Sequence, residues 1–219
     1  MQQDINHPAA VKALAWSPDG VHLVTGANTQ VAFWNATNGK QLARSTHRHA
    51  QMVTGLAWSA QNPMQVVSVG ADKRAVVWDG QQYRALLTYQ AHTNAIAAVS
   101  WSTDGKTVAT SSDGGAVRIW DAMKGMDIHG YYYDAQIPMR TLAFAPDGVQ
   151  LAVGGDDGIV RIWHALTCTN NNGQICQDVP QRLHLANVPI RSVAWSPDAR
   201  FLRSAQMMVR LPCCKPRRV

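Results

Sequence analysis

Three histidines recur at one place in a repeated pattern, and they are the side chains of this sequence best suited to chemistry. His7, His49 and His92 each precede an aromatic residue by nine positions, and an aspartate and a serine or threonine follow in several repeats. An imidazole can transfer protons near neutral pH or bind a metal ion through a ring nitrogen. The pattern therefore raises catalysis and metal binding as the first possibilities.

The spacing favours neither possibility. The three histidines are 42 and 43 residues apart, whereas metal-binding sequences bring at least some of their ligands close together along the chain. The sequence contains no GxSxG, HExxH, Walker loop or CxxC pair. We therefore predict no catalytic residue, no metal and no cofactor, and expect the elements around the histidines to explain their recurrence.

Those elements are two repeated phrases. The first phrase occurs as VKALAWSPDG (11–20), VTGLAWSAQN (53–62), AAVSWSTDG (97–105), MRTLAFAPDG (139–148) and IRSVAWSPDA (190–199). Its aromatic residues are spaced by 42, 43, 43 and 51 positions. The second phrase follows each of the first four copies, as VAFWN, AVVWD, VRIWD and VRIWH. All eight tryptophans stand at the aromatic position of one phrase or the other, so the chain is built from repeats.

Each repeat is typical of four short β-strands. An apolar strand such as ALAW ends in a turn such as SPDG, where proline presets φ and aspartate bonds the local backbone. The strands are apolar on both faces, so each sheet must be covered on both sides by other sheets. Four-stranded units stacked face to face around an axis form a β-propeller. No segment shows a helical period.

Over residues 5–205 the chain resembles the WD40 repeat family. Trp78-Asp79 and Trp120-Asp121 end their third strands as the family signature does, while Trp34-Asn35 and Trp163-His164 are degenerate versions. The resemblance implies an all-β fold, a propeller fragment of four complete four-stranded blades and the start of a fifth, not closed into a seven-bladed ring. The expected blades are residues 5–46, 47–89, 90–133 and 134–182, with a partial blade at 183–205.

The resemblance also implies a structural role for the histidines. In WD40 blades a histidine before the first strand bonds an aspartate in the second turn, and a serine or threonine and the third-strand tryptophan complete the buried chain. The matching residues are His7, Asn28 and Trp34 in the first blade; His49, Ser68, Asp72 and Trp78 in the second; His92, Thr110 and Trp120 in the third; and Asp157 and Trp163 in the fourth. Other residue types occupy the remaining positions: Val24 and Val153 for serine, Gly114 for aspartate and Ala135 for histidine.

A run of three tyrosines, Tyr131, Tyr132 and Tyr133, precedes the fourth expected blade. Tyrosine offers both contact area and a hydroxyl group, so the run is a candidate partner-binding site. The alternative, which we favour, is a fourth strand whose alternate rings pack between blades. That strand can still leave Tyr132 exposed.

The positive charge is concentrated at one end of the chain. The net charge is +6, and residues 200–219 carry six basic residues and no acid, so residues 1–199 hold 14 bases and 14 acids. The body gives no electrostatic support for nucleic-acid binding. We see no secretory signal, no apolar run long enough for a membrane span, and only four cysteines, too few for a disulfide framework in a chain this long. We expect a cytoplasmic protein.

The end of the chain departs from the repeat. The family pattern would continue WSPDARFL with an Asp-Gly turn, but the chain continues RSAQMMVRLPCC. Met-Met-Val is encoded ATG-ATG-GTN, and the frame that starts one base earlier reads Asp or Asn followed by Asp-Gly. We therefore expect residues 206–219 to be a basic non-repeat tail produced by a frame slip. The alternative is a genuine tail that binds anions.

The resemblance implies a non-enzymatic scaffold in which rigid blades hold variable loops on one rim, where a protein or peptide partner docks. A second hypothesis is a truncated product of a longer WD40 protein, with no function of its own. A third, less favoured, is an enzyme built on a propeller, which needs acids, bases or metal ligands to converge on the axis. Uncovered faces of the end blades also predict self-association.

Overall fold

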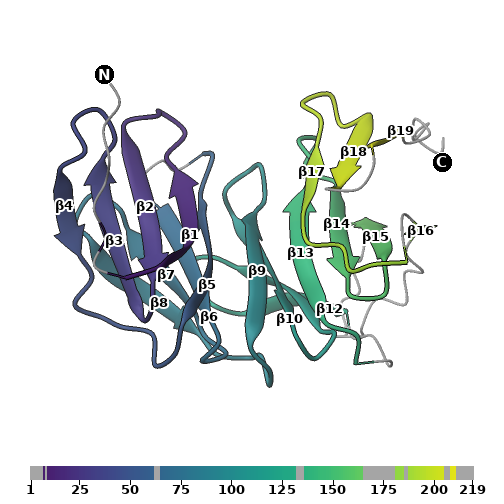
Figure 1. Ribbon diagram of the computed structural model, residues 1–219, viewed down its shortest axis with the longest axis horizontal. Helices are drawn as coiled ribbons and strands as arrows, with labels where there is room; N and C mark the ends of the chain where they lie inside the picture. The colour runs from purple at the N-terminus through teal and green to yellow at the C-terminus, as the bar shows by residue number, and fades with distance from the viewer. Residues whose placement is uncertain are drawn as a thin grey trace.

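The computed structural model describes residues 7, 9–61, 65–131, 136–164, 181–184, 187–204 and 208–210. These residues form β-strands and turns, with no helix among them, arranged in five antiparallel sheets (Figure 1). The prediction of an all-β propeller fragment is confirmed. We number the sheets as blades one to five in chain order.

In every blade the strands lie side by side in the order in which the chain makes them. Blade one contains β1 (Val11–Trp16), β2 (His22–Ala27), β3 (Gln30–Asn35) and β4 (Gln41–Arg44). Blade two contains β5 (Val53–Trp58), β6 (Gln65–Gly70), β7 (Ala75–Asp79) and β8 (Arg84–Tyr89). Blade three contains β9 (Ile96–Trp101), β10 (Thr107–Ser112), β11 (Val117–Asp121) and β12 (Asp127–Tyr131). Blade four contains β13 (Met139–Phe144), β14 (Gln150–Gly155), β15 (Ile159–His164) and β16 (Gln181–His184). Blade five contains β17 (Val193–Trp195), β18 (Phe201–Ser204) and β19 (Met208–Arg210).

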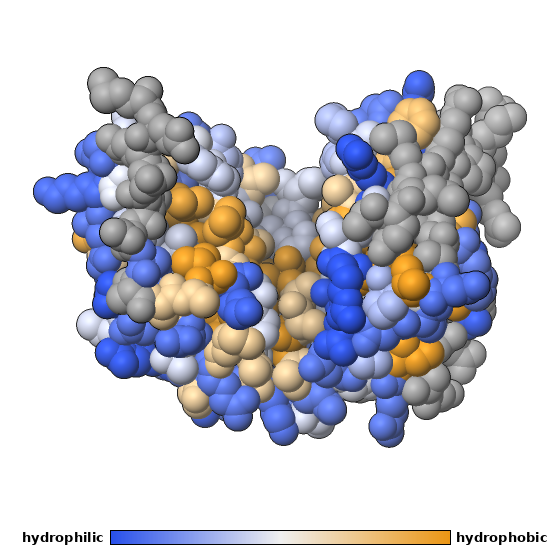
Figure 2. Space-filling view, in the orientation of Figure 1, coloured by the Kyte–Doolittle hydropathy of each residue, from blue (hydrophilic) through white to orange (hydrophobic). Residues whose placement is uncertain are grey.

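The first strands of successive blades are neighbours, so β1, β5, β9, β13 and β17 follow one another along the inner side of an arc. Figure 1 shows blade one and blade five at the two ends of this arc, with a gap between them. The ring is therefore open, as the sequence predicted. Figure 2 shows a hollow at this gap and apolar side chains gathered beside it.

The hydrophobic cores lie between blades rather than within them. Between blades one and two, Phe33 and Val24 pack with Trp58 and Trp78, and equivalent clusters fill the next three interfaces. Burial of each such side chain contributes roughly 1.5–3 kcal/mol. The stability of a blade therefore depends on its neighbours.

Blades two to five are also anchored to the preceding blade through the aromatic residue at the end of the first strand. Three indole nitrogens donate hydrogen bonds to main-chain carbonyls of the preceding blade: Trp58 to Ala15 (2.9 Å), Trp101 to Ala57 (3.1 Å) and Trp195 to Ala143 (2.9 Å). Phe144 has no ring donor, and its main-chain N–H donates instead to the hydroxyl of Ser100 (3.3 Å). The repeated aromatic position thus sets the spacing between blades.

The first turn of several blades is fixed by a serine and an aspartate. The Ser17 hydroxyl donates to Asp19 (2.5 Å), and Asp19 also accepts the main-chain N–H of Val21 (2.9 Å). The same pairing recurs at Ser102 with Asp104 and at Ser196 with Asp198. These hydrogen bonds hold the pKa of Asp19 and Asp198 below the ordinary value. The repeated aspartates of this turn therefore serve turn geometry.

Strand β19 lies in the segment that the sequence assigned to a non-repeat tail. It pairs with β18, placing Leu202 opposite Val209 and Phe201 opposite Arg210. The fifth sheet therefore continues beyond residue 205. Residues 211–219 lie outside the described part of the chain, and the frame-slip origin of the tail stays a prediction.

Candidate functional site

The segments that connect successive blades lie beside the turns between the second and third strands. Main-chain hydrogen bonds join them along the chain: Ala71 N–H to Met52 O (2.9 Å), Asp113 N–H to Ala95 O (3.0 Å) and Asp156 N–H to Pro138 O (3.0 Å). We name this side of the molecule the connection rim. The opposite side carries the first and third turns of each blade, and we name it the turn rim. All the histidines that the repeat pattern singled out belong to segments of the connection rim.

Blade two carries a complete buried chain of hydrogen bonds under this rim. The indole of Trp78 donates to the hydroxyl of Ser68 (2.8 Å), which lies 2.8 Å from His49 Nε2. His49 Nδ1 lies 3.0 Å from Asp72 Oδ1. With Nδ1 protonated, the hydroxyl donates to Nε2 and the imidazole donates to the carboxylate. The carboxylate also accepts the main-chain N–H groups of Ala50 (2.8 Å) and Arg74 (3.2 Å). The four residues expected from the sequence are thus brought together, and they tie the connection to the turn.

Blade three has the same chain without its acid. The Trp120 indole donates to Thr110 Oγ1 (3.3 Å), which lies 2.7 Å from His92 Nε2. Gly114 stands where blade two has aspartate, and His92 Nδ1 is buried with no hydrogen-bond partner among the described residues. Burial, together with the charge of Arg118, lowers the pKa of His92 to about 3. His92 is therefore neutral near pH 7.

In blade one the serine position was predicted wrongly. The Trp34 indole donates to Thr25 Oγ1 (2.8 Å), one residue beyond Val24. The turn between β2 and β3 is one residue shorter than in blade two, because Leu23 pairs with Trp34 while Val66 pairs with Trp78. Counting back ten residues from the tryptophan, as in the other blades, therefore misses Thr25.

Asn28 does not replace the aspartate of blade two either. It is exposed and adopts a left-handed conformation (φ 49°), as Lys73 does in the corresponding turn of blade two (φ 69°). His7 packs its ring 5.8 Å from that of Trp34, and neither ring nitrogen has a hydrogen-bond partner among the described residues. Burial and the charge of Arg44 lower the pKa of His7, and a weaker backbone contact at Ala9 opposes them.

Blade four uses a residue that the sequence analysis missed. Arg161 in β15 is fully buried, with a relative exposure of 0%. Its guanidinium bonds both carboxylate oxygens of Asp157, at 3.2 and 2.5 Å. Burial alone raises the pKa of Asp157, but the hydrogen bond and charge of Arg161 outweigh burial and lower it. Arg161 thus takes the place of the blade-two histidine as the side-chain partner of the turn aspartate. Ala135 lies outside the described residues, and Trp163 is buried beside Val153.

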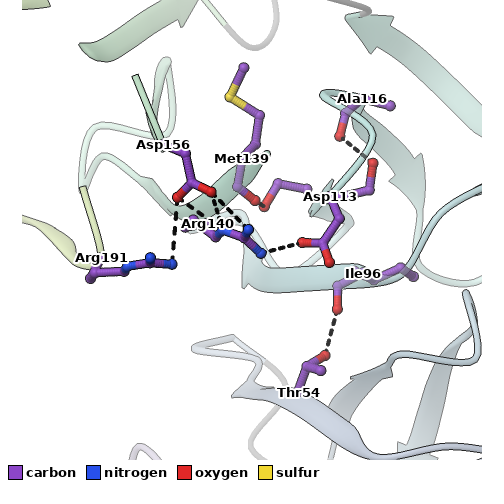
Figure 3. A network of polar contacts seen from close by, with 10 residues as sticks. Thr54, Ile96, Asp113, Ala116, Met139, Arg140, Asp156 and Arg191 are labelled. Carbon is purple, nitrogen blue, oxygen red and sulfur yellow. Dashed lines mark hydrogen bonds and ion pairs between the residues drawn. The ribbon is translucent and has the colours of Figure 1, made fainter. Parts of the chain in front are cut away.

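A second polar network crosses three blades on the same rim (Figure 3). Arg140 at the start of β13 bonds Asp156 of its own blade through Nε (2.9 and 3.0 Å) and Nη2 (2.8 Å). Its Nη1 bonds Asp113 of blade three (2.6 Å), and Arg191 of blade five lies 3.5 Å from Asp156. The hydrogen bond from Arg140 lowers the pKa of Asp156 and raises that of Arg140. Opposite charges therefore balance over blades three to five.

The tyrosine run is only partly described. Tyr131 is the last residue of β12, while Tyr132 and Tyr133 lie outside the described residues. Within the part of the chain that the structure describes, no three His, Cys, Asp or Glu side chains gather in a way that can hold a metal ion. The same residues include no helix that is long and apolar enough to cross a membrane.

The chain matches the family model "WD domain, G-beta repeat" at residues 2–35, 40–79, 83–121 and 131–164, more than half of its length. It is 35% identical over 126 residues to the B-type cell cycle switch protein ccs52B of Medicago truncatula, covering 55% of this chain and 25% of that protein. It is 27% identical over 114 residues to cell division cycle 20.1, cofactor of APC complex, of Arabidopsis thaliana, covering 51% and 24%. It is 34% identical over 121 residues to anaphase-promoting complex subunit cdh1 of Dictyostelium discoideum, covering 52% and 16%. Each match spans a quarter or less of the relative's length.

Proposed function

Because the chain belongs to the WD40 repeat family, we propose that it is a non-enzymatic scaffold that binds partner proteins through its connection rim. One relative is named a cofactor of APC complex and another a subunit of the anaphase-promoting complex, which supports a role in protein assembly. The proposal extends this general role by naming the face that binds. It includes the cytoplasmic location expected from the sequence, which a fluorescent fusion would test.

The observation that carries the proposal is the anchoring of the rim over blade two. Below the surface, His49 and Asp72 fix the connection and the turn with hydrogen bonds from both main chain and side chain. Above them, Ala50, Gln51 and Met52 are exposed. A backbone that is already fixed loses little conformational entropy when a partner binds its exposed side chains. This combination suits a docking surface.

Capture of partner proteins by two matched variants tests the choice of rim. Met52 on the connection rim and Met123 on the turn rim are both exposed methionines, at 42% and 69%. We expect Met52→Asp to abolish capture from an extract of the source organism, and Met123→Asp to leave it unchanged. The reverse pattern would place docking on the turn rim. If the unaltered chain captures no partner protein, the hypothesis of a truncated product without a function of its own is favoured.

A second proposal is self-association through the exposed face of blade one. Trp16 is 56% exposed, whereas the equivalent Trp58, which packs against a preceding blade, is 9% exposed. Leu14 and Val11 are exposed on the same strand. Apolar area of this kind favours association. Analytical ultracentrifugation should show a concentration-dependent dimer that Trp16→Ser abolishes. A monomer at every concentration would contradict this proposal and leave the scaffold proposal intact.

A further inference from the structure

Four cations on the connection rim of blades one and two have no acidic partner among the residues that the structure describes. We name Lys12, Arg48, Lys73 and Arg74 the basic corner. Lys12, Arg48 and Lys73 are exposed, and Arg74 is half-buried. The ion pairs among the described residues include none of the four. Lys12, Arg48 and Lys73 therefore present their charges to solvent in this part of the structure.

Main-chain contacts bring the four residues to one place. The segment that follows Arg48 contacts the second turn of blade one and the second turn of blade two. His49 N–H donates to Thr29 O (3.0 Å), and Ala50 N–H donates to Asp72 (2.8 Å). Lys73 and Arg74 follow Asp72 directly. Val53 N–H donates to Asn28 O (2.7 Å), and the neighbouring Ala27 pairs with Val11, next to Lys12. The basic corner is therefore one surface that spans two blades.

The corner has no exposed carboxylate to offset these charges among the described residues around it. Its acid, Asp72, has a side chain only 3% exposed and is bound to His49. In the second turn of blade two, Ala71 occupies the position that aspartate holds in blades three and four, since its N–H makes the equivalent main-chain bond. Lys73 takes the left-handed position that Gly115 and Gly158 hold. Blade two has thus exchanged an exposed acid for cations.

Blades three to five show the same rim with its charges balanced. There Arg140 is bonded to Asp113 and Asp156, and Arg191 also lies beside Asp156. The basic corner therefore ends where blade three begins, since the Asp113 carboxylate is 42% exposed. A nucleic-acid backbone that continued past the corner would meet arginines that are already paired with carboxylates. A short acidic protein segment would not.

Met52 belongs to the segment that follows Arg48 and lies beside the turn that carries Lys73 and Arg74. It is exposed, and its main chain is fixed by the bond from Ala71. Cations around an apolar side chain favour a ligand that carries several carboxylates and one apolar residue. We propose that the basic corner binds an acidic segment of a partner protein, with an apolar side chain of that segment against Met52. This inference rests on the proposed scaffold function and names the chemistry of its partner.

Fluorescence anisotropy with a synthetic peptide tests the inference. The probe is a fluorescein-labelled 12-residue peptide of glutamates around one leucine, compared with its glutamine counterpart and with a single-stranded oligonucleotide of equal charge. We expect only the acidic peptide to bind well. Its affinity should fall as the salt concentration rises, because salt screens the charges. Equal binding of the glutamine peptide, or tighter binding of the oligonucleotide, would overturn the proposal.

Charge-matched variants locate the binding. The double substitution Lys73→Glu/Arg74→Glu should lower the affinity for the acidic peptide about tenfold or more. Lys40→Glu/Lys106→Glu makes the same change in net charge on the turn rim and should have less than about a twofold effect. Circular dichroism confirms that each variant is folded, and Lys73→Gln/Arg74→Gln provides a milder pair if it is not. Equal losses in both pairs would mean that the peptide senses net charge only, which contradicts the proposal.

The inference and the scaffold function fail in different ways. If Met52→Asp abolishes partner capture but the acidic peptide does not bind, the scaffold stands and the acidic partner is wrong. If the peptide binds the corner and no partner is captured, the corner stands and the scaffold is wrong.

Discussion

Blade two and blade four hold the turn between their second and third strands with different side chains. In blade two, Asp72 is bound by His49, which is linked in turn to Ser68. In blade four, Asp157 is bound by Arg161. Each carboxylate also accepts a main-chain N–H of its own turn, from Arg74 and from Ile159, at 3.2 Å.

Blades two and four share a turn aspartate that is bound by a buried hydrogen-bond donor. The residue type of the donor differs between the two blades. In blade three the aspartate is absent, and His92 keeps only one of its two hydrogen bonds among the described residues. A buried polar atom without a partner loses its hydration and gains nothing in return. The comparison therefore ranks the blades by how fully their buried polar groups are paired.

Removal of the arginine from blade four should have the largest effect. Arg161 is fully buried and its partner Asp157 is half-buried, so Arg161→Ala both empties a buried site and leaves the carboxylate without its cation. We expect the free energy of unfolding to fall by about 3–5 kcal/mol. Urea titration followed by tryptophan fluorescence measures the loss. The control is Arg191→Ala, an exposed ion pair that should cost less than about 1 kcal/mol. Equal losses in the two variants would show that burial does not decide the strength of the pair.

Removal of the histidine from blade two should have the next largest effect. His49→Ala leaves Ser68 and Asp72 each short of one partner, at a cost of about 2–3 kcal/mol in the same titration. His184→Ala, which removes an exposed histidine of β16, should change stability by less than about 0.5 kcal/mol. Unchanged stability in His49→Ala, with loss of an activity, would argue for a chemical role of His49.

Acid should expose the weakness of blade three. The pKa of His92 falls from 6.5 to about 3 on folding, so the unfolded chain binds the additional proton. Above pH 6.5 this pKa difference does not lower the free energy of unfolding. As the pH falls from 6.5 toward 3, protonation of the unfolded chain lowers the free energy of unfolding. We expect a loss of about 2 kcal/mol between pH 7 and pH 5 from this residue. Urea titrations at both pH values measure it, and His92→Gln should remove that part of the dependence. An identical pH dependence in the variant would contradict the assignment.

Supplying the missing acid of blade three should have the smallest effect. A side chain at Gly114 meets Asn94 at 2.7 Å, so the substitution is made in an Asn94→Ala background. There, Gly114→Asp should stabilise the chain by about 1 kcal/mol and raise the pKa of His92, read by NMR titration. Gly114→Ala in the same background adds the Cβ without the acceptor. If it stabilises equally, the missing hydrogen bond is not the cause.

The fold could be read from the sequence because its signals repeat. The aromatic spacing predicted the number of blades, and the Ser-Asp turns predicted where the first strands end. Blade two could also be read in full, since its turns have the lengths that the repeat pattern assumes. The exception among the strands is β19, which pairs with β18 although its sequence does not follow the repeat.

The errors at the site have two physical causes. Thr25 was missed because one turn is a residue shorter, and a count along the chain cannot register a change in hairpin length. Arg161 was missed because an arginine in a strand usually points to solvent. Its burial depends on the neighbouring blade and on Asp157, which only the packed structure brings together.

The indole bonds between blades end on main-chain oxygens, and this has a consequence for how such a chain grows. An acceptor in the backbone is supplied by every residue type, so a copied gene segment that encodes one blade finds its anchoring point already present. For this hydrogen bond, insertion or loss of a blade requires no matching substitution in the neighbouring blade. A duplicated unit brings its own indole donor and meets an acceptor that any neighbouring blade supplies.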